Sequence, residues 1–379
     1  MGRPTIAEVD LDALRFNLQQ IRGHLQGKVE ILAVVKADAY GHGAEPVARE
    51  LALAGVSIFG VASVEEGAAL RRSGVSLPIL VLSGIDPGEF PEIIQNRLTP
   101  VLHSLDTARA LEGEAEGFRQ QIPVHLKVDT GMNRLGFPWR NWGAVVEFFR
   151  PQEKLQVQGL LSHLAAAESE RPEDRAFTEE QIRRFKACVH QARTAGIEPR
   201  YVHLANSAAT ARWEEAQFNL VRPGLMLYGV DPRPARGKGM PLKPALRWKT
   251  AVRDVKKVPA GDSVSYGRLY SCQRETRIAT LPVGYADGYR RRLSNRGEVL
   301  IRGQRAKVTG VVCMDLTMVD VSEIPGVQPG DEVVLLGQQG AEEISAEEMA
   351  GWAETIPYEV LCTIGKRVPR LYLRRKDRD

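Results

Sequence analysis

The sequence contains little cysteine and no long apolar run. Its four cysteines lie far apart without CxxC spacing, which argues against a zinc site or a disulfide framework and favours reduced thiols. No stretch approaches the roughly 20 apolar residues needed to cross a membrane, and the opening MGRPTIAEVD contains no apolar signal core. We therefore expect a cytoplasmic protein that does not act at a membrane.

No charge of one sign is in excess either. There are 51 Lys and Arg residues against 47 Asp and Glu residues, which gives a formal net charge of +4. The two basic clusters, at 290–292 and 374–376, are not interleaved with aromatic residues as nucleic-acid surfaces usually are. No GxGxxG motif follows an apolar run, which disfavours a dinucleotide cofactor. We expect a small-molecule substrate and no nucleic-acid partner.

What the sequence does contain, up to about residue 230, is an alternation of short apolar runs with longer amphipathic stretches. Apolar strands alternating with helices indicate a parallel sheet covered on both faces, and eight such units predict an eight-stranded β/α (TIM-like) barrel. An open doubly wound sheet is the alternative. The predicted strands are ILAVVK (31–36), SIFGVAS (57–63), PILVLS (78–83), LTPVLH (98–103), PVHLKVD (123–129), VQGLLSH (157–163), YVHLAN (201–206) and NLVRPG (219–224). Helices are predicted at 45–54, 64–73, 105–119, 178–195 and 207–215.

The texture changes after DPRP (231–234). Segments such as TRIATLPVG and DEVVLLG are β-rich and are interrupted by Gly, Pro and Asp, and one helix near 345–355 opens with a capping box of Ser345 and Glu348. We predict two domains, a barrel over residues 1–240 and a mostly β domain over residues 241–379.

Polar residues gather at the predicted carboxyl ends of the barrel strands, where barrels carry their chemistry. A single strand-end Lys or His is more often structural, but a set that converges on one rim favours a functional site. The set is Lys36, His103, Lys127, Asp129, His163, Asn206, Ser207 and Arg222.

Two turns at this rim suggest a phosphate site. HLANSAAT places Ser207 at a predicted helix N-cap, and RPGLMLYG places Gly224 and Leu225 at a helix start. An anchored phosphate with a lysine across the same rim matches pyridoxal phosphate, which needs an amine for a Schiff base. Lys36 is the candidate amine.

These motifs resemble those of the alanine racemases, pyridoxal phosphate enzymes with an N-terminal β/α barrel and a C-terminal β domain. The resemblance covers essentially the whole chain. The motifs that carry it are, in order, AVVKADAYGHG, KVDTGMNRLG, SHLAAAE, NSAA, VRPGLMLYG, SVSYGRLY, VGYADGY, VVCMDLTMVD and PYEVL. Three departures are Asp38, where the family often has asparagine, Asn133, which fills the variable place before Arg134, and Glu168, where a shorter aspartate is common.

In the barrel, the resemblance implies that Lys36 forms the internal aldimine, Arg134 orients the substrate and His163 lies beside the cofactor ring. It also implies that Lys127 corresponds to a lysine often carbamylated in the family. The other cofactor contacts that it implies are Tyr40, Asn206, Ser207, Arg222, Gly224, Leu225 and Tyr358.

In the β domain, the resemblance implies that Tyr266 is the second catalytic base, that Tyr285 lies at the substrate entrance, and that Met314 and Asp315 line the pocket. It further implies a homodimer in which each site borrows the partner's tyrosine, and an enzyme that supplies D-alanine for cell-wall peptidoglycan. Sequence alone leaves an intrachain site open.

The expected chemistry agrees with this set of residues. Racemisation removes a proton from one face of a planar centre and returns one to the other face, so it needs two acid–base groups, here Lys36 and Tyr266. Arg222 can only donate a hydrogen bond to the pyridine nitrogen and leaves it unprotonated, which suits a racemase better than an aminotransferase.

Three other functions remain as alternatives. A related decarboxylase would carry a glycine-triplet phosphate loop, which is not found. A small pyridoxal phosphate carrier would lack the β domain. A cofactor-free isomerase on the same barrel is the most distant alternative.

Overall fold

The computed structural model describes residues 3–118, 121–232 and 239–374, and the chain divides into two compact units. The barrel unit comprises residues 14–39 and 44–242, and the β unit comprises residues 1–13, 40–43 and 243–379. Parts of three features of the sequence lie outside the described residues, namely Arg119 of a predicted helix, Arg233–Pro234 of the interdomain turn and Arg375–Lys376 of the basic tail.

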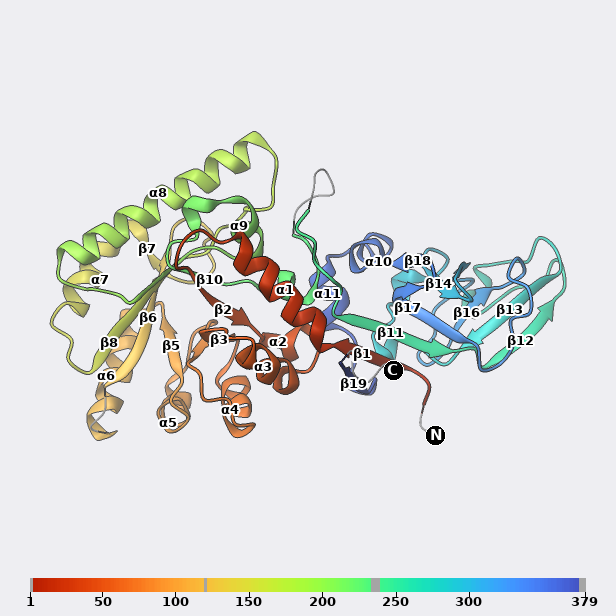
Figure 1. Ribbon diagram of the computed structural model, residues 1–379, viewed down its shortest axis with the longest axis horizontal. Coiled ribbons are helices and arrows are strands. Elements are labelled where there is room, and N and C mark those ends of the chain that lie inside the picture. Colours follow the sequence, from red (N-terminus) through yellow and green to blue (C-terminus); the bar gives the residue numbers. More distant parts are fainter. Residues whose placement is uncertain (1–2, 119–120, 233–238, 375–379) are drawn as a thin grey trace. The chain divides into compact units, whose positions relative to one another are not determined.

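In the described part of the barrel unit, eight parallel strands follow the order β10-β2-β3-β4-β5-β6-β8-β9, and the short β7 (Phe137–Pro138) pairs with β6 (Figure 1). The two end strands approach each other where the Arg222 N–H donates to the Ala205 carbonyl over 2.9 Å, so the barrel is nearly closed. All eight predicted strands are confirmed, and the open sheet is wrong. Their bounds are β2 (Glu30–Val34), β3 (Ile58–Val61), β4 (Ile79–Val81), β5 (Thr99–Leu102), β6 (Ile122–Asp129), β8 (Leu155–Leu161), β9 (Tyr201–His203) and β10 (Leu220–Val221).

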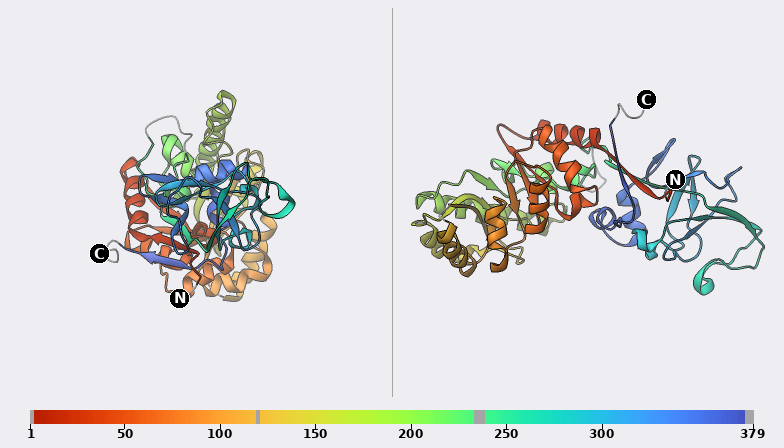
Figure 2. Two further views of the ribbon diagram at one scale, coloured as in Figure 1. Left: turned by 90° about the vertical axis from the view of Figure 1, so that its right-hand side faces the viewer. Right: turned by 90° about the horizontal axis from the view of Figure 1, so that it is seen from below.

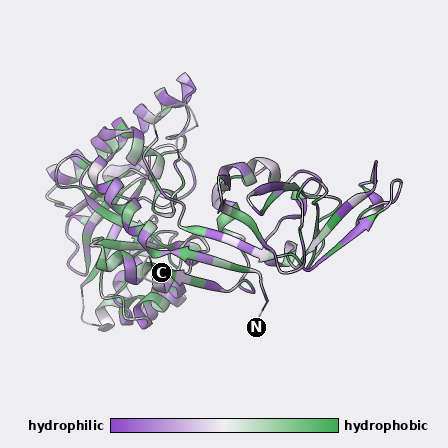
Figure 3. Ribbon diagram, turned by 45° about the vertical axis from the view of Figure 1, so that its right-hand side comes forward, coloured by the Kyte–Doolittle hydropathy of each residue, from purple (hydrophilic) through white to green (hydrophobic). Residues whose placement is uncertain are grey.

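Helices surround these strands, as two further views show (Figure 2). Helix α3, for example, buries Val47, Ala48 and Leu51 on the face that it turns to the strands. The strands are accordingly the most hydrophobic part of the unit, and polar residues colour the outer faces of the helices (Figure 3). The helices are α1 (Leu11–His24), α2 (Lys36–Tyr40), α3 (Ala44–Leu53), α4 (Val64–Arg72), α5 (Phe90–Gln95), α6 (Leu105–Phe118), α7 (Trp142–Phe149), α8 (Pro172–Thr194) and α9 (Ser207–Arg212), with 3-10 turns η1 (Pro87–Glu89), η2 (Trp139–Asn141), η3 (Glu214–Ala216) and η4 (Leu225–Tyr228).

The β unit contains two sheets within its described residues. One follows the order β15-β14-β17-β11-β1-β19 with β18 added on β17, and the other follows the order β12-β13-β16. Burial alternates along β11, as expected for a sheet with one covered face. The strands are β1 (Ile6–Asp10), β11 (Leu246–Ala251), β12 (Asp254–Val258), β13 (Thr276–Leu281), β14 (Glu298–Ile301), β15 (Gln304–Lys307), β16 (Thr317–Asp320), β17 (Glu332–Gln339), β18 (Glu342–Ile344) and β19 (Arg370–Leu373).

Strand β1 belongs to the β unit although it begins the chain. Ile6 pairs with Lys249 of β11 in an antiparallel register, and Ala7 pairs with Arg370 of β19 in a parallel one. The N-terminal residues are thereby held in a sheet whose other strands come from beyond residue 245.

Short helices complete the β unit: η5 (Tyr266–Arg268), η6 (Tyr285–Asp287), η7 (Arg291–Leu293), α10 (Ala346–Ala353) and α11 (Pro357–Cys362). The Ser345 hydroxyl caps α10 by accepting from the Glu348 N–H over 3.1 Å, which confirms the Ser345 half of the predicted capping box. The Glu348 carboxylate binds Arg305 at 2.7 Å. Among the described helices, none combines the length and the apolar character of a membrane span.

Candidate active site

Lys36 begins a left-handed turn directly after β2. Ala37, Asp38 and Ala39 have φ near 53° and ψ near 48°, and Tyr40 continues with φ 52°. Side chains other than glycine reach this region at a cost of roughly 1–2 kcal/mol per residue. The surrounding structure must therefore hold the turn, and with it the backbone that carries Lys36.

Two carboxylates hold this turn. Glu66 of α4 accepts from the Ala37 N–H and from the Ala62 N–H, both over 2.7 Å, so it links the ends of β2 and β3. Asp38 accepts from the Ala44 N–H over 2.7 Å. Asparagine is common in the family at this position. The contact with Ala44 needs only a side-chain oxygen as acceptor, and aspartate supplies one as asparagine does.

Arg134 lies in the loop that follows β6. The Asp129 carboxylate accepts from the N–H groups of Gly131 and Asn133 over 2.9 and 3.1 Å. Gly136 has φ 138°, and a Cβ there would come within 2.6 Å of the Asp129 nitrogen. The loop is therefore folded back tightly on the strand end, with Arg134 exposed on it.

Four cations act on one another at this rim. Burial, followed by the charges of Arg134 and Arg222 and more weakly of Lys36, lowers the pKa of Lys127 from 10.5 to about 8. Burial, then Arg222, Arg134, Lys127 and Lys36, holds the pKa of His163 well below its ordinary value. His163 is consequently neutral at physiological pH. Among the charged groups that shift the pKa of Lys127, Asp129 is the only negative one, so the rim as a whole is positively charged.

The buried Arg222 guanidinium links this rim to the barrel interior. It donates to His163 Nδ1 over 3.2 Å, to His203 Nδ1 over 3.1 Å and to the carbonyls of Ser162 and Leu204 over 2.8 and 3.0 Å. Burial lowers the pKa of Arg222 to about 9. Among the described residues no carboxylate contacts it, so its charge is uncompensated by the protein.

Sequence reasoning missed the buried histidines behind Arg222. His125 Nδ1 lies 2.8 Å from His203 Nε2, and a Cβ at Gly159 would come within 2.3 Å of the His125 ring. Both histidines are buried members of apolar strands, His125 in PVHLKVD and His203 at the end of β9 in YVHLAN, where an ionisable residue is unusual. That signal was present in the sequence.

The two predicted phosphate turns are adjacent. The Ser207 hydroxyl accepts from the Gly224 N–H over 2.9 Å, and Gly224 precedes η4 at Leu225, as predicted. The prediction that Ser207 is the N-cap of α9 is wrong. Asn206 is the N-cap, because its side-chain oxygen accepts from the Ala209 N–H over 3.0 Å, which frees the Ser207 side chain to reach the second turn.

Tyr40 and Tyr358 lie together in the β unit. Their ring centroids are 5.7 Å apart in an edge-to-face arrangement. Burial, with Tyr358 as a lesser cause, raises the pKa of Tyr40 far above its ordinary value, so Tyr40 remains a hydrogen-bond donor. Two tyrosines assigned by resemblance to one phosphate group are therefore neighbours.

The other β-unit candidates are carried by hydrogen-bonded neighbouring segments. The Tyr285 and Ala286 N–H groups donate to the carbonyls of Cys313 and Met314, both over 3.0 Å. The Ser265 hydroxyl, next to Tyr266, donates to the Val311 carbonyl over 2.7 Å. The segment 311–314, which carries Met314, is therefore hydrogen-bonded both to Tyr285 and to the residue before Tyr266.

The candidates therefore fall into two groups. The barrel group is Lys36, Lys127, Arg134, His163, Asn206, Ser207, Arg222, Gly224 and Leu225, and the β-unit group is Tyr40, Tyr266, Tyr285, Met314, Asp315 and Tyr358. Within each group the contacts above bring predicted residues together.

The chemistry of the barrel group fits the pyridoxal phosphate that the sequence resemblance implies. A phosphate and a substrate carboxylate are anions, and the rim offers several cations beside adjacent N–H-bearing turns. Arg222 offers only donors to a neutral ring nitrogen. A barrel with this rim and a separate β unit defines an enzyme that binds a phosphorylated cofactor and a small anionic substrate at the carboxyl ends of its strands.

Comparisons with known proteins agree. Residues 9–232 match the family model "Alanine racemase, N-terminal domain", and residues 245–372 match "Alanine racemase, C-terminal domain". An alanine racemase of Geobacter sulfurreducens is 47% identical over 373 residues, covering 98% of both chains.

Solved structures give the same result. An alanine racemase of Clostridium difficile superposes with a TM-score of 0.90 at 35% identity, covering 99% of this chain and 97% of that one. An alanine racemase of Bartonella henselae, solved with covalently bound pyridoxal phosphate, gives 0.88 at 31% identity, covering 98% and 100%. The chain belongs to the alanine racemase family, and its activity is the interconversion of L- and D-alanine.

Proposed function

We propose that this chain racemises alanine with pyridoxal phosphate as cofactor, with Lys36 and Tyr266 as opposing bases, and so supplies D-alanine for cell-wall peptidoglycan. The observation that carries the proposal is the convergence of four cations, Lys36, Lys127, Arg134 and Arg222, whose charges all act on a neutral His163. Two of them, Lys127 and Arg222, are buried, and a buried cation is costly unless an anion accompanies it, which an anionic cofactor would supply.

Lys36 and Tyr266 divide the proton transfers. Pyridoxal phosphate, when bound, makes the Cα–H bond of an amino acid acidic. Lys36 Nζ, held by the left-handed turn, exchanges the α-proton of D-alanine, and Tyr266 Oη exchanges that of L-alanine from the opposite face. Arg134 pairs with the substrate carboxylate.

Arg222 restricts the reaction to proton exchange. Its N–H groups would donate to the ring nitrogen of bound pyridoxal phosphate, and a guanidinium would offer that nitrogen no acceptor that keeps it protonated. A weaker electron sink favours return of the proton over transamination. In the barrel unit, Asn206, Ser207, Gly224 and Leu225 would hold the phosphate, and the family resemblance adds Tyr40 and Tyr358 of the β unit as phosphate ligands.

Lys127 is positioned to carry a carbamate. A pKa of about 8 leaves part of the amine neutral near physiological pH, and the neutral amine is the form that reacts with carbon dioxide. The carbamate would replace one cation of the rim by an anion and would offset the charges of Arg134 and Arg222.

Alanine is the preferred substrate, because the family resemblance places the bulky side chains of Tyr285, Tyr358 and Met314 around the substrate methyl group. Each extra methylene that does not fit costs about 1–3 kcal/mol, which excludes lysine and arginine. Serine is a poor substrate, since the Met314 thioether is only a weak hydrogen-bond acceptor for its hydroxyl.

The enzyme is a homodimer in which each site receives Tyr266 from the partner subunit. Support comes from large apolar side chains of the β unit that are exposed in the single chain, among them Tyr266 at 72%, Leu269 at 65%, Ile356 at 58% and Met314 at 53%. Four free cysteine thiols agree with a cytoplasmic location.

Incubation with L-alanine in deuterium oxide tests the function. The purified protein with pyridoxal phosphate should form D-alanine that carries deuterium at Cα, and Lys36→Ala should form none. Comparison of kcat/KM for L-alanine, L-serine and L-lysine tests the pocket. An inactive wild-type protein that binds pyridoxal phosphate would contradict the proposal, and a lysine value within about tenfold of alanine's would contradict the small pocket.

A further inference from the structure

The β unit contains a buried carboxylate, Asp287, in the same short helix as Tyr285. Asp287 ends η6, two residues after Tyr285, and is fully buried. Its Oδ2 accepts from the Gly284 N–H over 3.0 Å and thereby caps the helix that carries Tyr285. A buried carboxylate is costly unless it is paired, so its partners determine whether this helix holds its shape.

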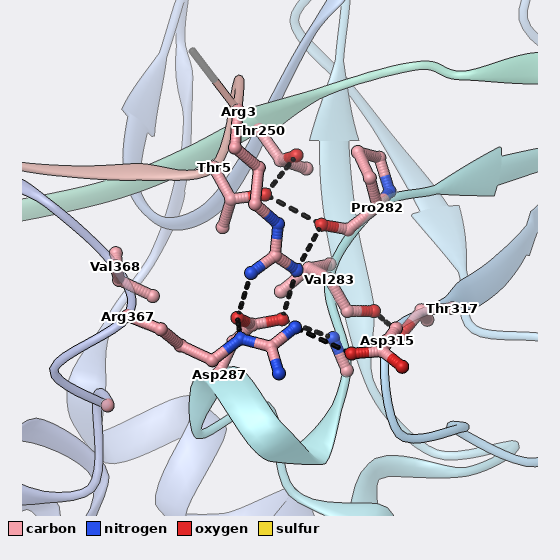
Figure 4. A network of polar contacts seen from close by, with 12 residues as sticks. Arg3, Thr5, Thr250, Pro282, Val283, Asp287, Asp315, Thr317, Arg367 and Val368 are labelled. Atoms are coloured by element: carbon pink, nitrogen blue, oxygen red, sulfur yellow. Dashed lines mark hydrogen bonds and ion pairs between the residues drawn. The ribbon is translucent and has the colours of Figure 1, made fainter.

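Two arginines from opposite ends of the chain bind Asp287 (Figure 4). Arg3 contacts both carboxylate oxygens, with Nη2 2.5 Å from Oδ2, and also donates to the Pro282 carbonyl over 2.8 Å. Arg367 places Nε 2.8 Å from Asp287 Oδ1. The Asp287 carboxylate therefore binds two guanidinium groups, and Arg367 has a further N–H donor that does not contact Asp287.

That donor reaches the turn of Met314 and Asp315. Arg367 Nη2 lies 2.6 Å from Asp315 Oδ1, so Arg367 bridges the buried Asp287 and the exposed Asp315 (Figure 4). The four groups together are electrically neutral. The backbone supports the same junction, because a Cβ at Gly284 would come within 2.3 Å of the Cys313 carbonyl oxygen.

Hydrogen bonds made by Arg370 hold the backbone segment that carries Arg367. It lies between α11, which carries Tyr358, and β19. Arg370 binds the carbonyls of Gly365, Val368 and Ile364 over 2.6–2.7 Å, and its Nε donates to the Gly41 carbonyl over 3.0 Å. The bridge therefore joins the Met314–Asp315 turn to the segment between α11 and β19, which is hydrogen-bonded next to Tyr40.

We propose that Arg367 is a positioning residue for alanine binding, which bridges Asp315 and Asp287 and so fixes the Met314–Asp315 turn against the helix of Tyr285. This rests on the proposed role of Met314 and Tyr285 in the substrate pocket. Asp315 then acts through Arg367 and does not bind the substrate, since a free carboxylate there would repel the carboxylate of alanine. Arg3 occupies the other side of Asp287.

The test is steady-state kinetics of the holoenzyme with L-alanine. Arg367→Gln should raise KM about tenfold, with kcat within about threefold, because a charge-assisted contact is lost while both bases are untouched. Arg367→Lys should recover part of this loss, since lysine keeps the charge but reaches one carboxylate at a time. Cofactor absorbance should be unchanged.

A double-mutant cycle separates positioning from direct binding. Asp315→Asn should raise KM as Arg367→Gln does, and the double variant should be no worse than the larger single effect. Two results would overturn the bridge. One is a double variant whose increase in KM equals the product of the two single increases, and the other is a KM within twofold of wild type in both single variants. Asp315→Asn, on the surface, keeps the test valid if Arg367→Gln fails to fold.

Arg305→Gln is the matched control. Arg305 pairs with Glu298, Glu342 and Glu348 in the same unit, and its side chain is 32% exposed against 43% for Arg367. It should lower thermal stability without moving KM, and an equal KM change would show that the effect is general and overturn the proposal. A wild-type protein without racemase activity would overturn the proposed function, whereas an active wild type with unaffected variants overturns only the bridge.

Discussion

At the residue scale, the rim is defined by several positive charges that lie close enough to shift one another's pKa values. The sequence predicts Lys36, Lys127, His163 and Arg222 as site residues, because each lies at or near the end of an apolar strand. It placed the helix cap at Ser207 where Asn206 holds it, since adjacent polar residues compete for a cap and only the backbone direction decides. Arg3, Asp287 and Arg367 give no local signal, because Asp287 pairs with residues that are 80 and 284 positions away in the sequence.

Lys127 provides a prediction on pH. Its pKa is lower in the folded protein than the ordinary 10.5, so between about 8 and 10.5 the unfolded chain binds more protons and stability rises with pH. Under carbon-dioxide-free conditions, Lys127→Met should be more stable than wild type at pH 7 by at most roughly 3 kcal/mol, and this advantage should shrink towards pH 10.

Urea unfolding at several pH values measures this difference. Lys186→Met, at an exposed position of the same unit, is the control substitution. An advantage of Lys127→Met that stays constant from pH 7 to pH 10 would contradict the lowered pKa.

At the scale of secondary structure, buried strands are the most predictable elements. A parallel strand covered on both faces needs a continuous apolar run, and all eight runs correspond to strands whose bounds differ from the predictions by a few residues. Strand β1 was not assigned to the β unit, because its partners β11 and β19 lie about 240 and 360 residues further along the chain. The left-handed turn was also missed, since Ala37, Asp38 and Ala39 carry no glycine signal.

That turn provides a prediction on stability. Ala37 is exposed with φ 52°, so Ala37→Gly should relieve strain and stabilise the protein by roughly 0.5–1 kcal/mol. Ala110, an exposed alanine within α6, should respond in the opposite direction, and Ala110→Gly should cost about 1 kcal/mol. Thermal unfolding of both variants decides the matter. Loss of stability in both would show that the turn is not strained.

At the scale of the whole molecule, the candidate residues are divided between two compact units, and the chain order does not reveal which copy completes which site. The family supplies the inference of a shared site, and the exposed apolar side chains of the β unit supply its physical support. The domain boundary near residue 240 remains a proposal. The compact units separate at residues 242 and 243 and also assign residues 1–13 and 40–43 to the β unit.

Subunit complementation provides the prediction at this scale. Lys36→Ala and Tyr266→Phe homodimers should both be nearly inactive. If each site takes Lys36 from one subunit and Tyr266 from the other, a heterodimer regains one intact site, and random mixing should restore about a quarter of wild-type activity. Heterodimers that form without regaining activity would indicate an intrachain site.

The central claim is that Lys36 and Tyr266 act on opposite faces of the substrate, and isotope exchange in Tyr266→Phe tests it most directly. The variant is incubated separately with L-alanine and D-alanine in deuterium oxide, and deuterium at Cα is followed over time. The account predicts that D-alanine still exchanges its α-proton, whereas exchange from L-alanine falls by at least about a hundredfold. Equal residual exchange from the two enantiomers would contradict it.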